Sequence, residues 1–303
     1  MCRPVDRLAV NEIASPTISG KTRGPLGTLA CVPIGVLAFD FDPYLRLGDG
    51  VVRWETIGVA VAIFAALVLA GIGARTMELR ADDLIFIVLG IVPGAVIGGR
   101  LGYVLLHRSF FAANPGAILD PSIGSLELGL AVVGGALTGG VVAALLDSSI
   151  GRWFHISALP VLVALGAGKL ALVLGGRDQG LPWDGSFATA FLGSGPWGSL
   201  APDIPSHPSQ VYEGFATLIV LVAMMGILAL PGLRRPDGRA FLIALGLWAI
   251  VRFLVALTWR DPIVIGPLRA EQVIDLAILA GCVAGVAILV RRERPASQAA
   301  ATG

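Results

Sequence analysis

Seven long apolar runs most constrain the fold of this chain, because a segment of about 20 predominantly apolar residues is long enough to cross a bilayer as a helix. The runs cover residues 56–74, 84–106, 126–146, 156–176, 211–230, 240–259 and 272–290. The sequence therefore predicts an all-α integral membrane protein with about seven transmembrane helices.

The overall composition agrees with a membrane protein. Hydrophobic residues make up 55% of the 303 residues and charged residues 14%, whereas soluble proteins carry about 25% charged residues. The mean hydropathy is +0.82. These values exclude a soluble enzyme and a disordered chain, and a net charge of +1 provides no basic surface for a nucleic acid. Three widely spaced cysteines form no metal-binding pattern, and nothing in the sequence indicates a cofactor.

The arginines predict the orientation of the chain, since positively charged residues accumulate in cytoplasmic loops. With the C-terminus inside, the inner side holds nine arginines, namely Arg75, Arg80, Arg152, Arg234, Arg235, Arg239, Arg291, Arg292 and Arg294. The outer side holds six, namely Arg46, Arg53, Arg108, Arg177, Arg260 and Arg269. We therefore expect the N-terminus outside and the C-terminus inside.

This orientation divides the chain into three parts. Residues 1–37 begin with a polar stretch punctuated by Pro and Gly, and we expect a poorly ordered leader there. Residues 38–292 form one membrane domain, and residues 293–303 form a cytoplasmic tail. Within the third apolar run, small residues predict close approach of a neighbouring helix: Gly134, Gly135, Gly139 and Gly140.

Three cations lie inside apolar runs, where an unpaired charge is costly and usually faces a bundle interior or a watery cavity. Counted along the helices from the inner side, Arg100, Lys169 and Arg252 all fall in the outer half of the bilayer. We therefore expect one cavity shared by the three cations and open to the outer leaflet. Arginine presents a planar donor fork to phosphate oxygens, so a phospholipid phosphate is the natural ligand.

Other ionisable residues gather at the same ends of the apolar runs. Carboxylates open several runs from the outer side: Glu127, Glu213, Glu271 and Asp275. We interpret Glu271 as a solvated helix end. His107 and His155 lie at the ends of runs, and we expect them at the membrane interface.

Several segments resemble those of the bacterial prolipoprotein diacylglyceryl transferases. The segment His207-Pro-Ser-Gln-Val-Tyr-Glu213 is similar to the H-P-[ST]-Q-x-Y-E block of that family, at the head of a transmembrane helix. Gly98-Gly-Arg-Leu-Gly-Tyr-Val104 resembles the family's segment that ends the second span, and Phe41-Asp-Pro43 resembles its stretch before the first helix. Arg252 resembles the arginine of the family's penultimate helix. The agreement covers residues 38–292.

The resemblance implies an activity. Family members move the diacylglyceryl group of phosphatidylglycerol onto the lipobox cysteine thiol in the signal peptides of exported prolipoproteins, at the bacterial plasma (inner) membrane, and release glycerol 1-phosphate. The implied catalytic residues are Arg252 on the phosphate and Glu213 orienting an arginine. His207 is the one outer-face histidine left in a family motif, so by elimination we expect it to accept the thiol proton. The implied substrate-binding residues are Arg100, Lys169, Gln210, Tyr212 and Gly180.

The family signature is only partly present. The pattern G-R-x-[GA]-N-x-x-N-x-E-x-x-G corresponds to Gly168-Lys-Leu-Ala-Leu-Val-Leu-Gly-Gly-Arg-Asp-Gln-Gly180. Its Arg, two Asn and Glu are here Lys169, Leu172, Gly175 and Arg177. A His, a Tyr and a second Glu of the family are replaced by Val133, Ile57 and Ala256. The alternatives are therefore a phospholipid-binding homologue that has lost the chemistry or uses another acceptor, and, with less support, a transporter.

Overall fold

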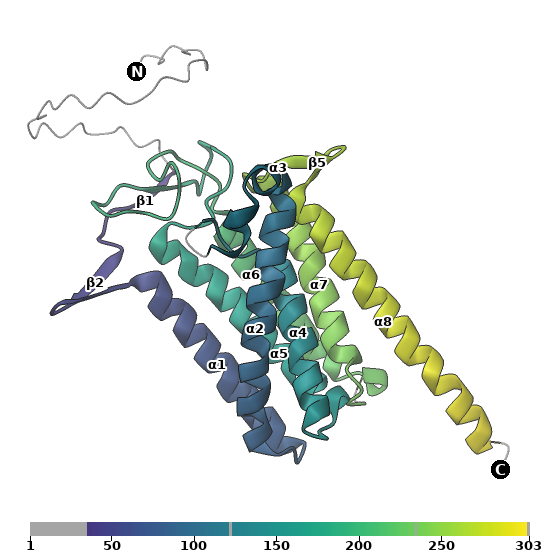
Figure 1. Ribbon diagram of the computed structural model, residues 1–303. Coiled ribbons are helices and arrows are strands. Elements are labelled where there is room, and N and C mark those ends of the chain that lie inside the picture. The colour runs from purple at the N-terminus through teal and green to yellow at the C-terminus, as the bar shows by residue number, and fades with distance from the viewer. Residues whose placement is uncertain (1–34, 121–122, 234, 302–303) are drawn as a thin grey trace, which may run out of the picture. The chain divides into compact units, whose positions relative to one another are not determined.

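The computed structural model describes residues 35–120, 123–233 and 235–301, so most of the predicted leader lies outside the described part. Within that part, seven helices are long and apolar enough to cross a membrane, which confirms the prediction (Figure 1). They are α1 (Trp54–Thr76), α2 (Ala81–Leu106), α4 (Leu128–Leu145), α5 (Ile150–Ala171), α6 (Ser209–Leu228), α7 (Arg239–Val255) and α8 (Ala270–Ala301). Helix α8 continues through residues that the sequence predicted as a tail.

Short elements connect these helices. One short α-helix, α3 (Arg108–Ala113), and four 3-10 turns, η1 (Pro115–Leu119), η2 (Leu172–Gly175), η3 (Pro231–Leu233) and η4 (Ala256–Thr258), lie between or at the ends of the spans. Strand β1 (Leu37–Phe39) pairs in parallel with β4 (Thr189–Phe191). Two antiparallel pairs join β2 (Tyr44–Leu47) to β3 (Gly50–Arg53), and β5 (Ile263–Ile265) to β6 (Leu268–Arg269). These strands were not expected from the sequence.

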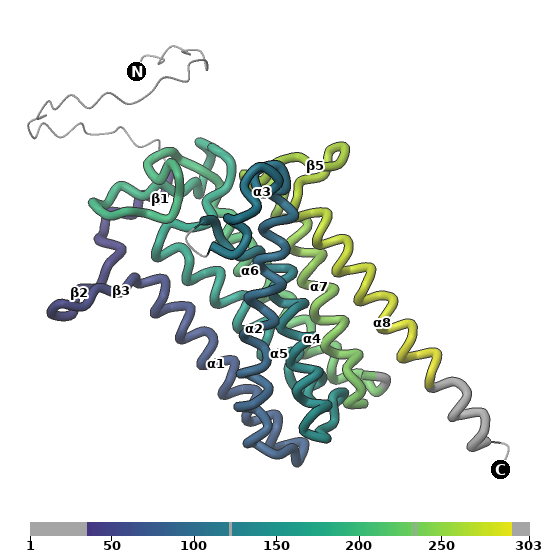
Figure 2. The backbone as a smooth tube through the Cα atoms, viewed as in Figure 1, coloured from purple at the N-terminus to yellow at the C-terminus, as the bar shows by residue number. Residues whose placement is uncertain are grey.

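The connections between the long helices differ in length at the two ends of the bundle. The segments 107–120, 123–127, 176–208 and 259–269 lie at one end of the bundle together with β1, and we call it the loop-rich end (Figure 2). The hairpin of β2 and β3 lies beside the start of α1. The turns 77–80, 146–149 and 229–238 are at the other, short-turn end. The starts of α4, α6 and α8 and the ends of α5 and α7 therefore all lie at the loop-rich end.

Helices α2 and α4 pack closely through glycines, as the sequence predicted. A Cβ atom added at Gly98 would meet the carbonyl of Leu130, and one at Gly134 would meet the carbonyl of Gly94. Gly135 and Gly139 lie against the side chain of Ile91 in α2, which a Cβ atom at either position would meet. The remaining glycine of the run, Gly140, faces a ring of α5 instead.

The core of the bundle surrounds α7, which is the most deeply buried of the seven spans. Trp248 of α7 is fully buried, and it belongs to one apolar cluster with Leu162 of α5 and Met224 of α6. Apolar side chains alone hold most of this cluster together. Arg252, four residues after Trp248 in the same helix, is only 1% exposed, so α7 carries a buried charge beside this core, toward the loop-rich end.

Candidate active site

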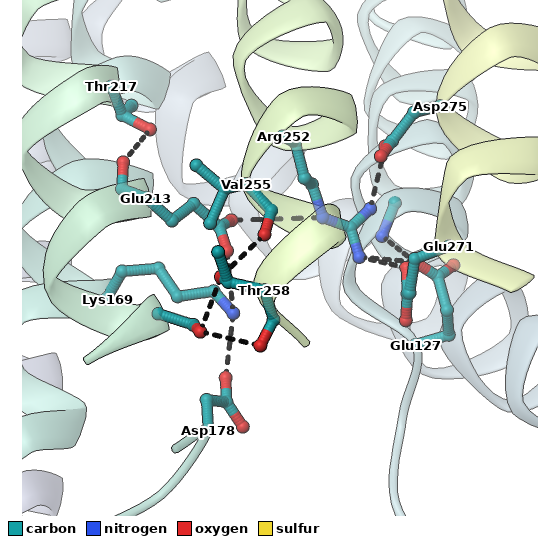
Figure 3. Close-up of polar contacts among 12 residues, drawn as sticks. Glu127, Lys169, Asp178, Glu213, Thr217, Arg252, Val255, Thr258, Glu271 and Asp275 are labelled. Atoms are coloured by element: carbon teal, nitrogen blue, oxygen red, sulfur yellow. Dashed lines mark hydrogen bonds and ion pairs between the residues drawn. The ribbon is translucent and has the colours of Figure 1, made fainter. Parts of the chain in front are cut away.

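Arg252 of α7 lies within a group of carboxylates that three other helices supply (Figure 3). Its Nη2 atom is 3.0 Å from Glu127 Oε1 and also binds Glu271, while its Nη1 atom is 3.2 Å from Asp275 Oδ1. Its Nε atom is 3.8 Å from Glu213 Oε1. Charge-assisted contacts on all three nitrogens fix the guanidinium in one position.

Lys169, the second buried cation, shares a carboxylate with Arg252. The Nζ atom of Lys169 is 3.1 Å from Glu213 Oε2 and 2.7 Å from Asp178 Oδ2. Glu213 is fully buried between the two cations, as Figure 3 shows. It therefore couples the position of Lys169 on α5 to that of Arg252 on α7, and its orienting role stays a prediction.

Helix ends explain why these side chains converge. Glu127 precedes α4 and caps it, because its carboxylate accepts the N–H groups of Gly129 and Leu130. Glu271 and Asp275 are four residues apart at the start of α8, so they lie on one face of that helix. Lys169 is in the last turn of α5 and Glu213 in the first turns of α6.

Tryptophan rings complete the cation site. Lys169 Nζ lies 4.3 Å from the centre of the Trp259 ring, and the Arg252 guanidinium lies 5.6 Å from the same ring. Trp248 is 5.3 Å from that guanidinium on α7 itself. Cation–π contacts with these rings stabilise the two cations.

A cavity of about 280 Å³ opens beside this network at the loop-rich end. Ligand pockets for small molecules usually exceed about 300 Å³, so the cavity suits a lipid head group better than a whole lipid. Its ionisable lining residues are His107, Glu127, Lys169, Asp178, Arg252, Arg260, Asp261 and Glu271, with Tyr103 beside them. Lys169 and Arg252 thus share one cavity, as predicted.

Two loop carboxylates of this cavity differ in environment. Burial favours the neutral form of Asp178, but the Lys169 ammonium outweighs it and holds the pKa of Asp178 below its usual range. Burial raises the pKa of Asp261 instead, and its Oδ2 atom is buried with no hydrogen-bond partner among the described residues. Asp178 is 38% exposed at its side chain, so it lies at the mouth of the cavity.

Arg100 does not line this cavity, and the expectation of three cations around one space is wrong in that respect. Its guanidinium donates to four backbone carbonyls of the segment between α2 and α4, at 2.6–3.0 Å. These acceptors are Ala117, Ile118, Asp120 and Ile123. Arg100 therefore holds this connection in shape.

Four predicted site residues do not line the cavity, namely His207, Gln210, Tyr212 and Gly180. His207 stacks on Trp183 at 4.4 Å, its Nδ1 atom has no partner among the described residues, and burial lowers its pKa. The Gln210 side chain is fully buried, while Tyr212 is partly exposed and lies edge-on to His207. Gly180 accepts a hydrogen bond from Arg260 at 2.6 Å and has no room for a side chain beside Ser209.

Sequence reasoning gave too little weight to several residues of the site. Glu271 is 7% exposed and bound to Arg252, so the interpretation as a solvated helix end is wrong. Asp178 and Trp259 were given no role, because a residue at the end of a span or just beyond it gives no periodic signal. His107 was expected at the membrane interface, yet it lines the cavity. A search for ionisable residues within one turn of each span end would have found all of these except Trp259.

Comparison with known proteins places this site in a family. A statistical model of the family described as prolipoprotein diacylglyceryl transferase matches residues 43–290. The chain belongs to the prolipoprotein diacylglyceryl transferase family. A relative from Geobacter sulfurreducens is 28% identical over 263 residues, which cover 84% of this chain and 96% of the relative. A relative from a Nostoc species is 26% identical over 276 residues, with 87% and 95% covered.

A third relative, from Clostridioides difficile, is 24% identical over 251 residues, which cover 82% of this chain and 95% of the relative. All three relatives are named phosphatidylglycerol–prolipoprotein diacylglyceryl transferase. The residues around Arg252 and Lys169 all lie within the part of the chain that the family model matches. Together with its seven apolar helices, membership in the transferase family makes this chain a multi-pass membrane protein.

The replaced signature positions of the transferase family have new partners in this chain. Arg177 pairs with the buried Glu55 at 3.0 Å, and Arg53 pairs with the same carboxylate at 2.8 Å. A side chain at Gly175 would collide with Glu55, so the loss of an asparagine there makes room for this carboxylate. Val133 lies on a separate apolar groove between α4 and α8.

Proposed function

We propose that this protein transfers the diacylglyceryl group of phosphatidylglycerol to the lipobox cysteine of exported prolipoproteins and releases glycerol 1-phosphate. The observation that carries the proposal is the pair of buried cations, Lys169 and Arg252, beside one cavity at the loop-rich end. The phosphodiester is the anionic part of the lipid, and two cations held in place by buried partners are arranged to stabilise the departing phosphate.

Carboxylates already neutralise both cations, so a phosphate has to replace one of them. Glu127, Glu213 and Asp275 are at most 3% exposed, so moving any of them away from its cation would leave a buried carboxylate without that partner. Asp178 can turn into water because its side chain is 38% exposed. The incoming phosphate therefore takes the place of Asp178 on Lys169, while Arg252 keeps its carboxylates.

The acyl chains of the lipid bind in an apolar groove between α4 and α8. The groove has a volume of about 690 Å³. It begins at Leu130, three residues after Glu127 of the polar cavity, and continues along Ile278 and Cys282 of α8. Its lining is almost wholly apolar, which suits lipid tails. A lipid with its head group at Lys169 and its tails in this groove enters sideways from the bilayer.

The arginine distribution and the family of the relatives support a location for the protein. The loop-rich end faces the outside of a bacterial plasma (inner) membrane, where exported prolipoproteins present their lipobox cysteine. The short-turn end and the C-terminus then face the cytoplasm, as the excess of arginines on that side favours.

The transfer reaction itself tests the proposal. Purified protein is incubated with phosphatidylglycerol and a lipobox peptide, and glycerol phosphate release and peptide lipidation are followed. We expect both products from the unchanged protein, and a loss of at least 100-fold in Arg252→Lys, because lysine cannot reproduce the fork that three nitrogens of arginine form. Arg46→Lys, at an exposed pair with Asp42, is the matched control and should keep full activity.

A phospholipid-binding homologue without transferase chemistry is the second candidate, and the replaced positions Leu172, Gly175 and Arg177 favour it. The same assay separates the two. If phosphatidylglycerol binds with the same affinity to the unchanged protein and to Arg46→Lys, but neither releases glycerol phosphate, the transferase proposal is wrong and the lipid-binding function stands.

A further inference from the structure

The proposed transfer needs a group that takes the thiol proton, since the thiolate and not the thiol is the nucleophile. In this chain the histidine position of the family is Val133, which lies on the apolar groove and offers no proton acceptor. The sequence contains three histidines, all within the described residues. His155 is in the first turns of α5, at the short-turn end.

His107 is the histidine that lines the polar cavity, together with Lys169 and Arg252. It follows α2 directly, and its backbone N–H donates to the carbonyl of Tyr103. His207 instead stacks on Trp183 and is not part of the cavity wall. The position of His107 therefore distinguishes it from the other two histidines.

The contacts of His107 define which ring nitrogen can accept a proton. Its Nδ1 atom lies 3.0 Å from the carbonyl oxygen of Tyr103. A carbonyl only accepts hydrogen bonds, so Nδ1 carries the hydrogen and Nε2 is left with its lone pair. The imidazole also stacks on the Tyr103 ring, with the ring centres 4.1 Å apart. Both contacts come from the preceding helical turn and hold the ring in one orientation.

We propose that Nε2 of His107 is the group that accepts the proton of the lipobox thiol. This inference rests on the proposed transferase function. The thiol proton passes to Nε2, and the thiolate sulfur forms a bond to the terminal glycerol carbon of the diacylglyceryl group. The bond between that carbon and the phosphate oxygen breaks, and glycerol 1-phosphate leaves with the electron pair. The imidazolium then returns its proton to the leaving phosphate or to water.

Charged groups of both signs line the cavity with His107. They are the carboxylates of Glu127 and Glu271, at the starts of α4 and α8, the loop carboxylates of Asp178 and Asp261, and the cations Lys169, Arg252 and Arg260. The carboxylates are weaker candidates themselves. Ordinary pKa values are about 8.5 for a thiol, 6.5 for imidazole and 4 for a carboxyl group, so proton transfer to imidazole is the less unfavourable. Glu127 and Glu271 are moreover bound to Arg252.

Three single variants test the proposal: His107→Gln, His207→Gln and His155→Gln. Transfer to a lipobox peptide is measured from pH 6 to pH 9.5, and phosphatidylglycerol binding is measured separately. We expect His107→Gln to lose about 100-fold or more at pH 7 and to keep lipid binding. Its deficit should shrink toward pH 9.5, because the thiol then ionises without help. His155→Gln, at the far end of α5, is the control and should keep the wild-type profile.

A second variant distinguishes the loss of a proton acceptor from a disturbance of the structure around residue 107. His107→Ala should regain transfer when free imidazole is added, because a small base can enter the space that the ring leaves. Undiminished transfer in His107→Gln, a deficit that does not depend on pH, or a loss confined to His207→Gln would each overturn the assignment. Absence of transfer in the unchanged protein would instead count against the proposed function.

Discussion

At the residue scale, Asp178 and Lys169 form the contact that the proposed lipid has to open. Lys169 Nζ is 2.7 Å from Asp178 Oδ2. The ammonium keeps the pKa of Asp178 below its usual range, so Asp178 is ionised at neutral pH and competes with a phosphate for the same cation. Its contribution to stability is present above about pH 4 and is lost as the pH falls through the folded-state pKa.

We therefore predict that Asp178→Asn binds phosphatidylglycerol more tightly than the unchanged protein. Removing the competing charge of the partly exposed Asp178 carboxylate from Lys169 should lower the dissociation constant about threefold to tenfold. The measurement is lipid binding at pH 7 in detergent micelles. Asp42→Asn removes a carboxylate from an exposed contact with Arg46 and serves as the control. Equal or weaker binding by Asp178→Asn would contradict the exchange of Asp178 for phosphate.

The sequence predicts the two central cations of this site but not their partners. Lys169 and Arg252 are detectable because a cation inside an apolar run is rare and costly. Glu271 looked like an ordinary solvated helix end, since its partner is on the neighbouring helix and only the packing of α7 against α8 brings the two together. Arg100 has the same sequence signal as Arg252, yet its acceptors are carbonyls of a connecting segment, which no residue pattern indicates.

At the element scale, the seven helices follow from the sequence because each apolar run is long and continuous. The three strand pairs do not, and β1 with β4 shows why. Leu37 pairs with Thr189, more than 150 residues away, and strands of three residues carry no usable alternation pattern. The contact depends on the whole loop between α5 and α6, so local sequence cannot indicate it.

The close approach of α2 and α4 gives a prediction at this scale. Gly134→Ala should destabilise the protein by about 1–3 kcal/mol, because the added Cβ would meet the backbone of Gly94, which no side-chain rotation can relieve. Thermal unfolding in detergent measures the effect. Gly226→Ala, in α6, is the matched control: nothing lies within 4 Å of its Cβ position. A similar unfolding temperature for both variants would show that the two helices can separate without cost.

At the scale of the whole molecule, the orientation in the membrane can be tested with single cysteines. Cys2, Cys31 and Cys282 are first replaced by alanine, and then Leu200→Cys and Ser149→Cys are made separately. Leu200, in the loop between α5 and α6, is 99% exposed, and Ser149 is exposed in the short turn before α5. An impermeant maleimide should label Leu200→Cys in intact spheroplasts and Ser149→Cys only after permeabilisation. Labelling in the opposite order would place the C-terminus outside.

The carboxylates around Arg252 also bear on the order in which the chain is synthesised. Glu127 and Glu213 precede Arg252 in the sequence, but Glu271 and Asp275 follow it. When α7 leaves the ribosome, half of the partners of its arginine therefore do not yet exist. An arginine at the centre of a lone helix costs about 2.5–3.5 kcal/mol during insertion, and Arg252, in the last turn of α7, should cost less than that. Helix α7 should consequently integrate more efficiently when α8 follows it as a hairpin, and nascent chains that stop after α7 and after α8 would show the difference.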